Sequence, residues 1–382
     1  MEIFVGLVWC FLATVVISRA CDGFESAADY LGRNMTEGVK GATINAVGSS
    51  MPELCTTFVF LFMFRDVDGF AGGIGTTAGS AVFNSMIIPA AVIISVVLTL
   101  RIETLNVSKK VILRDGLMLI LADAVLIFLI SNDTLYWWHG MILIMMYCGY
   151  AWYMLWNMNK GNSTDATESD EKDEEPDKPE KSKWIAIMTL DLDSLCVGNN
   201  GMGTSRAWVL LATATMFIAG ACHVLVYGCD KVGKGLGIPI YFVAVVLAAA
   251  ASSVPDTILS IKDAKKGNYD DAISNAFGSN IFDICFALGA PLFLYCLIYG
   301  KISMNPETVA NVIELLILLL VLTIGSFLIF YIGTGLRKAK AYGLLALYGL
   351  FILFIAGKAF HHPIAIQIAE ALHRIYDFIP RG

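Results

Sequence analysis

The stretch Gly48-Ser-Ser-Met-Pro-Glu53 places a glutamate and a proline inside a long apolar run, and Ala251-Ser-Ser-Val-Pro-Asp256 repeats this pattern later in the chain. A second pair of motifs follows the first. Gly79-Ser-Ala-Val-Phe-Asn84 matches Gly278-Ser-Asn-Ile-Phe-Asp283. Unrelated sequence would rarely match at four such places in the same order. The repeats therefore indicate two related halves.

The composition is that of a membrane protein. The 382-residue chain is 57% hydrophobic and 15% charged, with a mean hydropathy of +0.68, whereas soluble domains are about 25% charged. A helix needs roughly 20 apolar residues to cross a bilayer. The sequence predicts an all-α integral membrane protein with about ten transmembrane helices. The predicted spans cover residues 3–18, 42–64, 69–98, 111–130, 135–156, 208–227, 238–261, 270–297, 309–332 and 343–359.

A polar segment separates the two halves. Residues Lys160–Lys183 are acidic and contain two prolines, so they cannot bury a core. The expected parts are an N-terminal five-helix repeat (1–159), a flexible acidic cytoplasmic loop (160–206), a C-terminal five-helix repeat (207–360) and an amphipathic tail (361–382). Five spans per half make the second repeat cross the membrane upside down. Inverted repeats are typical of secondary transporters, which hold their substrate at the midplane.

Lysine and arginine residues gather in the loops on one side of these spans, and the positive-inside rule makes that side cytoplasmic. Both termini are then outside, and we expect the plasma membrane as the location. We interpret the first apolar run as a retained span rather than a signal peptide, because no basic residue precedes it. The acidic loop is interpreted as a spacer, with calcium regulation as the alternative. In the tail, Ile364, Ile368, Leu372 and Ile375 recur at helical spacing and predict a helix on the membrane surface.

Three acids, Glu53, Asp256 and Asp283, lie inside predicted spans. An ionised carboxylate at the centre of a membrane helix costs about 2.5–3.5 kcal/mol on the insertion scale, and three together would repel one another. No lysine or arginine lies in the central parts of these spans to neutralise them. A bound cation or a captured proton is the physical solution.

The first pair of motifs supplies oxygen ligands around two of these acids. The second serine of each motif precedes the acid by three residues, so both side chains share a helix face. Each proline lacks the N–H that would pair with the carbonyl of Gly48 or Ala251. Calcium takes roughly six to eight oxygen ligands, and the lack of His and Cys disfavours zinc, copper and iron. The candidate ligands here are Gly48, Ser49, Ser50, Glu53, Ala251, Ser252, Ser253 and Asp256.

The second pair of motifs adds further oxygens. Ser80 and Asn84 are four residues apart and share a helix face, as do Ser279 and Asp283. These neutral and singly charged groups suit sodium, which needs fewer and weaker ligands than calcium. Glycines in the same helices let the backbones approach closely.

Three other polar residues in apolar runs have no partner in the repeats. We interpret Asp123 and Glu314 as helix-packing or water-facing acids. His223 is interpreted as a core histidine. None of the three is assigned to the ion site.

At these motifs the chain resembles the cation/calcium exchanger superfamily, most closely the potassium-dependent sodium/calcium exchanger branch and its microbial relatives. The resemblance covers most of both halves, including Cys21-Asp22 through Gly41-Ala42 and Arg114-Asp115, but not the acidic loop. It implies ten helices in two inverted halves, with the second, third, seventh and eighth forming the ion site. In one departure, the second motif has Ala-Ser-Ser where the family usually has Gly-Thr-Ser, which bears on relative ion affinities.

The resemblance also implies individual roles. Glu53 and Asp256 match the central calcium-binding carboxylates. Asp283 matches the aspartate linked to potassium co-transport in animal members, although microbial members without potassium dependence can have an acid there. The matched hydroxyl and carbonyl ligands are Ser49, Ser50, Ser252 and Ser253, and the matched sodium-site residues are Ser80, Asn84, Ser279 and Asp283.

The sequence therefore predicts a sodium/calcium antiporter that works by alternating access, with calcium and sodium competing at a midplane site. Potassium dependence stays open. We expect no enzymatic activity, no cofactor and no nucleic-acid partner; the partners are the lipid bilayer and the transported ions. A proton/calcium exchanger is the nearest alternative, and a cation channel is a second one. The sequence does not indicate an oligomeric state.

Overall fold

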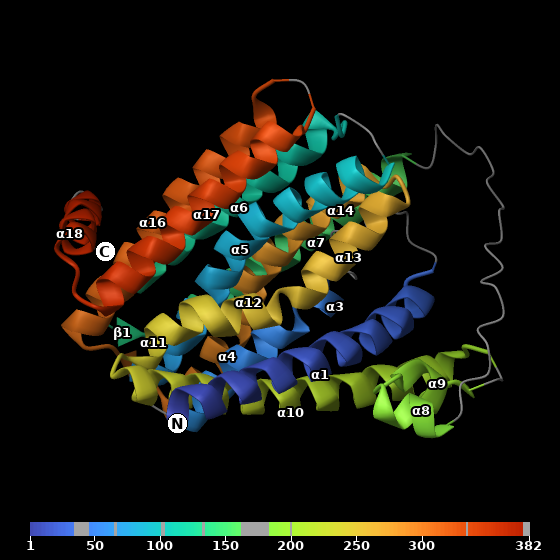
Figure 1. Cartoon of the computed structure of the whole chain (residues 1–382), viewed down its shortest axis with the longest axis horizontal. Coiled ribbons are helices and arrows are strands. Elements are labelled where there is room, and N and C mark those ends of the chain that lie inside the picture. The colour runs from blue at the N-terminus through green and yellow to red at the C-terminus, as the bar shows by residue number, and fades with distance from the viewer. Residues whose placement is uncertain are drawn as a thin grey trace.

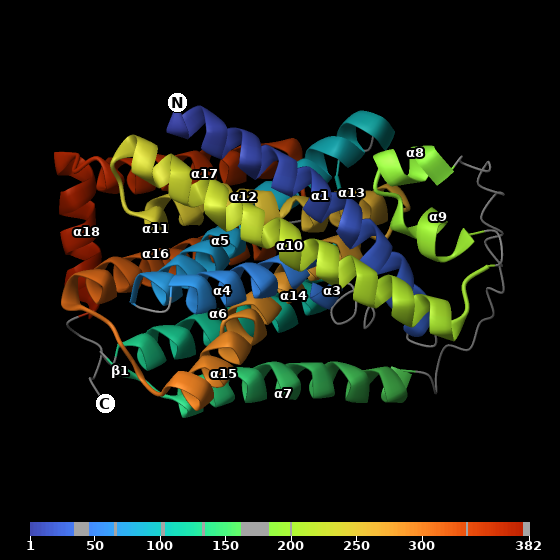
Figure 2. The same ribbon diagram turned by 90° about the horizontal axis from the view of Figure 1, so that it is seen from below.

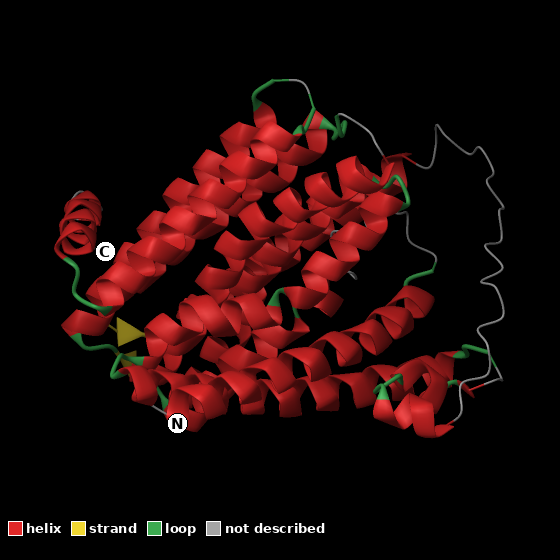
Figure 3. Ribbon diagram, viewed as in Figure 1, coloured by secondary structure: helices red, strands yellow, loops and turns green. Residues whose placement is uncertain are grey.

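The computed structural model describes residues 1–33, 46–64, 67–100, 104–131, 134–161, 183–198, 201–333 and 335–376. Helices make up almost all of this part of the chain (Figure 3). One short ribbon pairs β1 (Thr134–Leu135) with β2 (Ile302–Ser303) in antiparallel register. The acidic stretch at residues 162–182 lies outside the described residues.

Within the described residues, seven helical segments are long and apolar enough to cross a membrane, as expected for a multi-pass membrane protein. They are α1 (Glu2–Leu31), Phe70–Thr99 within α5 (Val67–Leu100), α10 (Thr204–Leu236), Ile240–Lys265, Tyr269–Tyr299, α16 (Pro306–Tyr331) and α17 (Lys338–Ala359). The other predicted spans coincide with α3 (Ala46–Ser49) plus α4 (Met51–Phe64), α6 (Lys109–Ile130) and α7 (Trp137–Gly161). These three do not meet the same length and composition criterion, so the total of ten stays a prediction.

Helices α1 and α10 pack against each other along much of their length (Figures 1 and 2). Glycines permit this contact, because a Cβ atom added at Gly6 would lie only 2.7 Å from the Gly228 carbonyl oxygen. Small residues are the usual means by which membrane helices approach closely. The pair encloses its own cluster of buried apolar side chains, which extends to Ala244 and Ala248.

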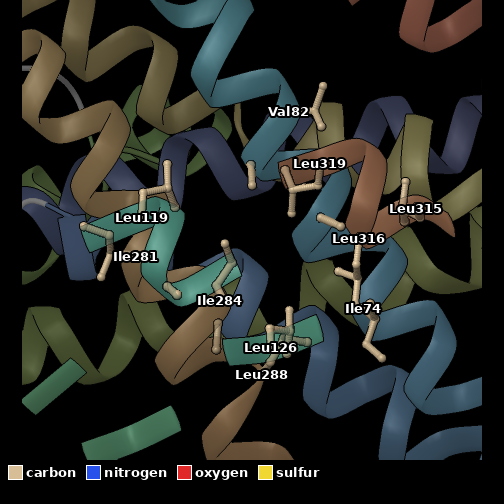
Figure 4. Packing of buried hydrophobic residues seen from close by; sticks show 14 of the residues in the cluster. Ile74, Val82, Leu119, Leu126, Ile281, Ile284, Leu288, Leu315, Leu316 and Leu319 are labelled. Carbon is tan, nitrogen blue, oxygen red and sulfur yellow. The ribbon is translucent and has the colours of Figure 1, made fainter. Parts of the chain in front are cut away.

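A larger apolar core lies among α5, α6, α16 and α14 (Tyr269–Phe282) (Figure 4). Leucine, isoleucine and valine side chains from these helices interdigitate there. The labelled members are Ile74, Val82, Leu119, Leu126, Ile281, Ile284, Leu288, Leu315, Leu316 and Leu319. This packing fixes the helices that bear the second pair of motifs.

Two spans are broken at equivalent motif positions. Ser50 separates α3 from α4, and Ser253 separates α12 (Ala249–Ser252) from α13 (Val254–Lys265). Each break lies two residues before a proline, as expected for a residue that removes a helical hydrogen bond. The prediction of broken helices at the two motifs is therefore confirmed.

Two π-helical turns also interrupt the second half. They are η3 (Ala244–Ala248), which follows α11 (Ile240–Val243), and η4 (Asp283–Ala287), which leads into α15 (Gly289–Tyr299). In η4 the N–H of Leu288 donates to the Asp283 carbonyl oxygen at 3.1 Å. Single π turns inside α-helices often occur at functional sites, and this one begins at a predicted ligand.

Short helices follow the acidic stretch and the last long helix. Residues within 160–206 form α8 (Lys183–Met188) and α9 (Leu192–Cys196). The tail forms α18 (Pro363–Tyr376), which packs on α16 and α17. Its buried face holds Ala365, Ala369 and Leu372, whereas Ile364, Ile368 and Ile375 are exposed. The predicted tail helix therefore exists, but all three isoleucines assigned to its apolar stripe face away from the protein.

The prediction of a core histidine at position 223 is wrong. His223 is exposed, and its neighbour Cys222 occupies the buried face of α10. An apolar run in a membrane helix has a face directed away from the protein, and sequence alone does not say which residues lie on it.

Candidate functional site

Ser80 of α5 links both halves of the chain. Its Oγ lies 3.0 Å from Oε1 of Glu53 and 3.2 Å from Oδ2 of Asp283, and it can donate to either carboxylate. The Ser253 hydroxyl is 2.8 Å away, and the Asn84 amide donates to Ser80 at 3.3 Å. All five side chains are fully buried. Four different helical segments thus converge on one hydroxyl group.

Asp256 has a matching arrangement. Ser279 of α14 donates its hydroxyl to Oδ1 of Asp256 at 2.7 Å. The Ser49 hydroxyl, at the end of α3, lies 3.5 Å from that of Ser279. Ser279 and Asp256 occupy the motif positions that Ser80 and Glu53 occupy in the first half. The same bond from a serine to an acid therefore occurs once in each half.

The remaining motif residues flank the two helix breaks. Gly48 lies in the last turn of α3 and Ala251 in α12, both beside the interruptions. Ser252 donates its hydroxyl to the Ala249 carbonyl at 3.2 Å. The Ser50 hydroxyl is buried and has no hydrogen-bond partner in the described part of the chain. All twelve predicted site residues thus lie in or next to the elements that build the cluster.

Several buried oxygens in this cluster lack a hydrogen-bond partner among the residues that the structure describes. They are Ser50 Oγ, Glu53 Oε2, Asn84 Oδ1, Asp256 Oδ2 and Asp283 Oδ1. Buried polar atoms are rarely left unpaired, because each costs about 1–3 kcal/mol. No ion pair to these acids occurs within the described ranges. All of these candidate ligand atoms are oxygens, which are the ligands that calcium and sodium prefer.

The carboxylates alone do not form a metal site. In the described ranges, no three His, Cys, Asp or Glu side chains stand close enough to ligate one ion. Hydroxyl, amide and backbone oxygens have to complete the coordination, as the repeated serines would allow. This composition suits an ion that is bound and released, because fewer full charges hold it.

Asn280 has a role that the motif analysis did not assign. Its amide donates to the Ala81 carbonyl at 3.0 Å and to the Ser85 hydroxyl at 2.9 Å, so it joins α14 to α5 beside the acids. In the sequence, Asn280 follows Ser279 at the motif position where the first half has Ala81. This polar residue in place of an apolar one was the signal that could have indicated its role. Which helix it would contact depends on how the halves pack, and the motifs do not specify that.

The other intramembrane acids lie apart from this cluster. Glu314 of α16 pairs with Lys358 of α17, and its other oxygen is 3.9 Å from His373 of α18. Asp123 of α6 is buried beside Thr323 of α16. Both positions fit the interpretation of helix-packing acids.

Comparison with known proteins finds relatives that have the names of cation exchangers. The sequence profile of the family described as sodium/calcium exchanger protein matches residues 5–156 and again residues 206–357. Human sodium/potassium/calcium exchanger 3 is 35% identical over 149 residues, 38% of this chain and 23% of that protein. Human sodium/potassium/calcium exchanger 5 is 25% identical over 364 residues, 76% of this chain and 70% of that protein. The matched part thus spans about a quarter of the length of the first of these relatives.

Two solved structures share the fold. The sodium-calcium exchanger NCX_Mj superposes with a TM-score of 0.55 at 20% identity and covers 92% of this chain and 98% of its own. The H⁺/Ca²⁺ exchanger CAX gives a TM-score of 0.60 at 15% identity, covering 97% and 92%. Because the family profile matches most of both halves, the chain belongs to the sodium/calcium exchanger family.

Proposed function

We propose that the protein is a sodium/calcium antiporter with ten transmembrane helices arranged as two inverted five-helix repeats. Calcium binds between Glu53 and Asp256, and sodium binds at the flanking positions Ser80, Asn84, Ser279 and Asp283. The observation behind this proposal is the set of unpaired carboxylate oxygens from both halves in one buried cluster. The flanking serines bond to Glu53 and Asp256, so these two acids serve both ions and occupation by one excludes the other.

The transport cycle in this proposal is alternating access. The two halves offer equivalent acid and serine pairs, so the inward- and outward-open states are close in energy. Both termini lie outside and the acidic loop is cytoplasmic, with the plasma membrane as the location. The relatives named sodium/potassium/calcium exchangers support potassium as a third ion, with Asp283 as its ligand.

A proton/calcium exchanger is the second candidate. The fold of CAX superposes on this chain at least as well as that of NCX_Mj. In this alternative Glu53 or Asp283 takes up protons in place of sodium. The serines and asparagines around the acids favour sodium, because they are oxygen ligands and do not exchange protons at neutral pH.

Replacement of one central acid tests the proposal. Glu53→Gln and Asp256→Asn should each lower sodium-driven calcium flux into proteoliposomes at least about tenfold, since a lost charged contact exceeds ~1.4 kcal/mol. Asp123→Asn removes a buried acid outside the cluster and should leave the flux near the wild-type rate. Separate sodium, potassium and proton gradients identify the coupled ion.

Flux at wild-type rates in both Glu53→Gln and Asp256→Asn would contradict the proposed site. Calcium flux driven by a pH gradient without sodium would favour the proton exchanger. Flux that needs no counter-ion would indicate a channel.

A further inference from the structure

A narrow cavity lies between α1, α3 and α13 and reaches the candidate ion site. Its wall includes Cys21, Asp22 and Glu25 of α1 and Ser49 of α3. Its volume of about 10 Å³ is close to the smallest that holds one water molecule. A hydrated cation cannot pass. The cavity therefore resembles a closed passage between the acidic side of α1 and the Ser49 hydroxyl.

Lys262 of α13 forms ion pairs with two acids of the cavity wall. Its Nζ lies 3.1 Å from Oδ1 of Asp22 and 3.9 Å from Oε2 of Glu25. Ile258 and Leu259, one turn earlier on α13, line the cavity itself. The lysine thus connects α13 to α1 through two residues that line the cavity.

The ion pairs of Lys262 are partly exposed to solvent, so they are weak. The side chains of Lys262 and Asp22 are 48% and 42% exposed, and that of Glu25 is 25% exposed. Ion pairs at such positions contribute up to about 1 kcal/mol. A sodium or calcium ion that approaches the two carboxylates competes with the Lys262 ammonium group.

This closure occurs in one half only. Counted from the motif prolines, Val59 of α4 takes the position that Lys262 takes in α13. Val59 packs against the apolar cluster of α1 and α10. The first half thus has an apolar contact at the position where the second half has an ion pair.

We infer that Lys262 is a gating residue, whose ion pairs with Asp22 and Glu25 close one route to the ion site until a cation competes for the two carboxylates. The inference rests on the proposed function for the identity of the cation. In the orientation proposed above, this route opens on the cytoplasmic side. Lys262 does not touch the transported ion in the central site, so it is a positioning residue.

Thiol labelling of the native Cys21 tests the gate without any transport measurement. The full chain is solubilised without sodium or calcium and treated with a hydrophilic methanethiosulfonate, and labelled peptides are quantified by mass spectrometry. Cys21 is 3% exposed and lines the passage. In Lys262→Gln we expect it to react up to about fivefold faster, the factor that a surface ion pair supports.

Two internal controls accompany this measurement. Cys10 lies on the same helix, 3.9 Å from the thiol of Cys229, and its labelling should not change. Lys234→Gln removes an exposed pair with Asp230 on α10 and should leave Cys21 as in the wild type. Lys262→Arg keeps the positive charge and should restore slow labelling, which separates gating from misfolding.

A calcium flux measurement gives the second arm. Lys262→Gln should lower the cytoplasmic calcium concentration for half-maximal flux by up to about fivefold, while Lys234→Gln should not. Unchanged Cys21 labelling in Lys262→Gln alongside normal flux would overturn the gate and leave the antiporter proposal standing. Faster labelling in a chain that exchanges no sodium for calcium would overturn the antiporter and leave the gate.

Discussion

At the scale of single residues, Ser80 deserves comparison with its counterpart Ser279. Both donate to the acid of their own half, but Ser80 is also within 3.2 Å of Asp283 and 2.8 Å of Ser253. Asp283 holds the motif position that Asn84 holds in the first half. Ser80 therefore links the two halves at the site, as do Ser279 through Ser49 and Asn280 through Ser85.

Ser80→Ala should weaken calcium binding by about tenfold, because a hydrogen bond to a charged group is worth about 1.5–3 kcal/mol. Isothermal titration of calcium into the purified chain measures this change. Ser326→Ala, which removes a buried hydroxyl bonded to the Thr323 carbonyl in α16, is the control. Equal losses in both variants would mean that the effect of Ser80 is a general packing effect.

At the scale of elements, the broken helices could be predicted from sequence and the π turns could not. A proline two residues after Ser50 or Ser253 has no N–H, so it removes a helical hydrogen bond. The break can therefore be predicted from the residues next to it. A π turn adds one residue to a helix without any residue type that demands it. Its position depends on the neighbour: α5 presents Gly79 to the Val245 carbonyl in η3, and a Cβ there would collide.

Gly79→Ala should destabilise the protein by about 1–3 kcal/mol, the usual cost of overpacking. The backbone of η3 cannot yield as a flexible side chain would. Thermal unfolding in detergent is the measurement. Gly325→Ala in α16 is the matched control, because nothing lies within 4 Å of a Cβ added there. A Gly79→Ala protein as stable as Gly325→Ala would show that α5 and η3 can separate freely.

At the scale of the whole molecule, the candidate ion site is built from side chains of both halves. Sequence could locate its acids, because intramembrane carboxylates without basic neighbours are conspicuous. It could not reveal that Ser80 contacts Ser253, or that Asn280 bridges to Ser85, since both contacts depend on how the halves pack. The sequence repeats show which residues hold equivalent positions in the two halves. Which of these residues contact one another depends on how the halves pack.

Calcium should therefore stabilise the assembled halves against unfolding. At a concentration about 100 times its dissociation constant, a ligand adds ~2.7 kcal/mol, which corresponds to a rise of roughly 5 °C in the unfolding temperature. Magnesium should give a smaller rise, because it sheds water reluctantly and demands octahedral geometry. Glu53→Gln should abolish the calcium effect, and an unchanged rise in that variant would contradict binding between the halves.

The unpaired oxygens of Glu53, Asp256 and Asp283 also bear on how faithfully the two ion flows are coupled. An exchanger wastes a gradient whenever it changes its facing direction without cargo. With no ion bound, that movement would leave several carboxylates buried and uncompensated, at about 2.5–3.5 kcal/mol for each charge. In the proposed exchanger, the vacant carrier should therefore stay at the membrane face where it released its ion until another cation arrives. The feature that makes the site attractive to calcium therefore also suppresses slippage.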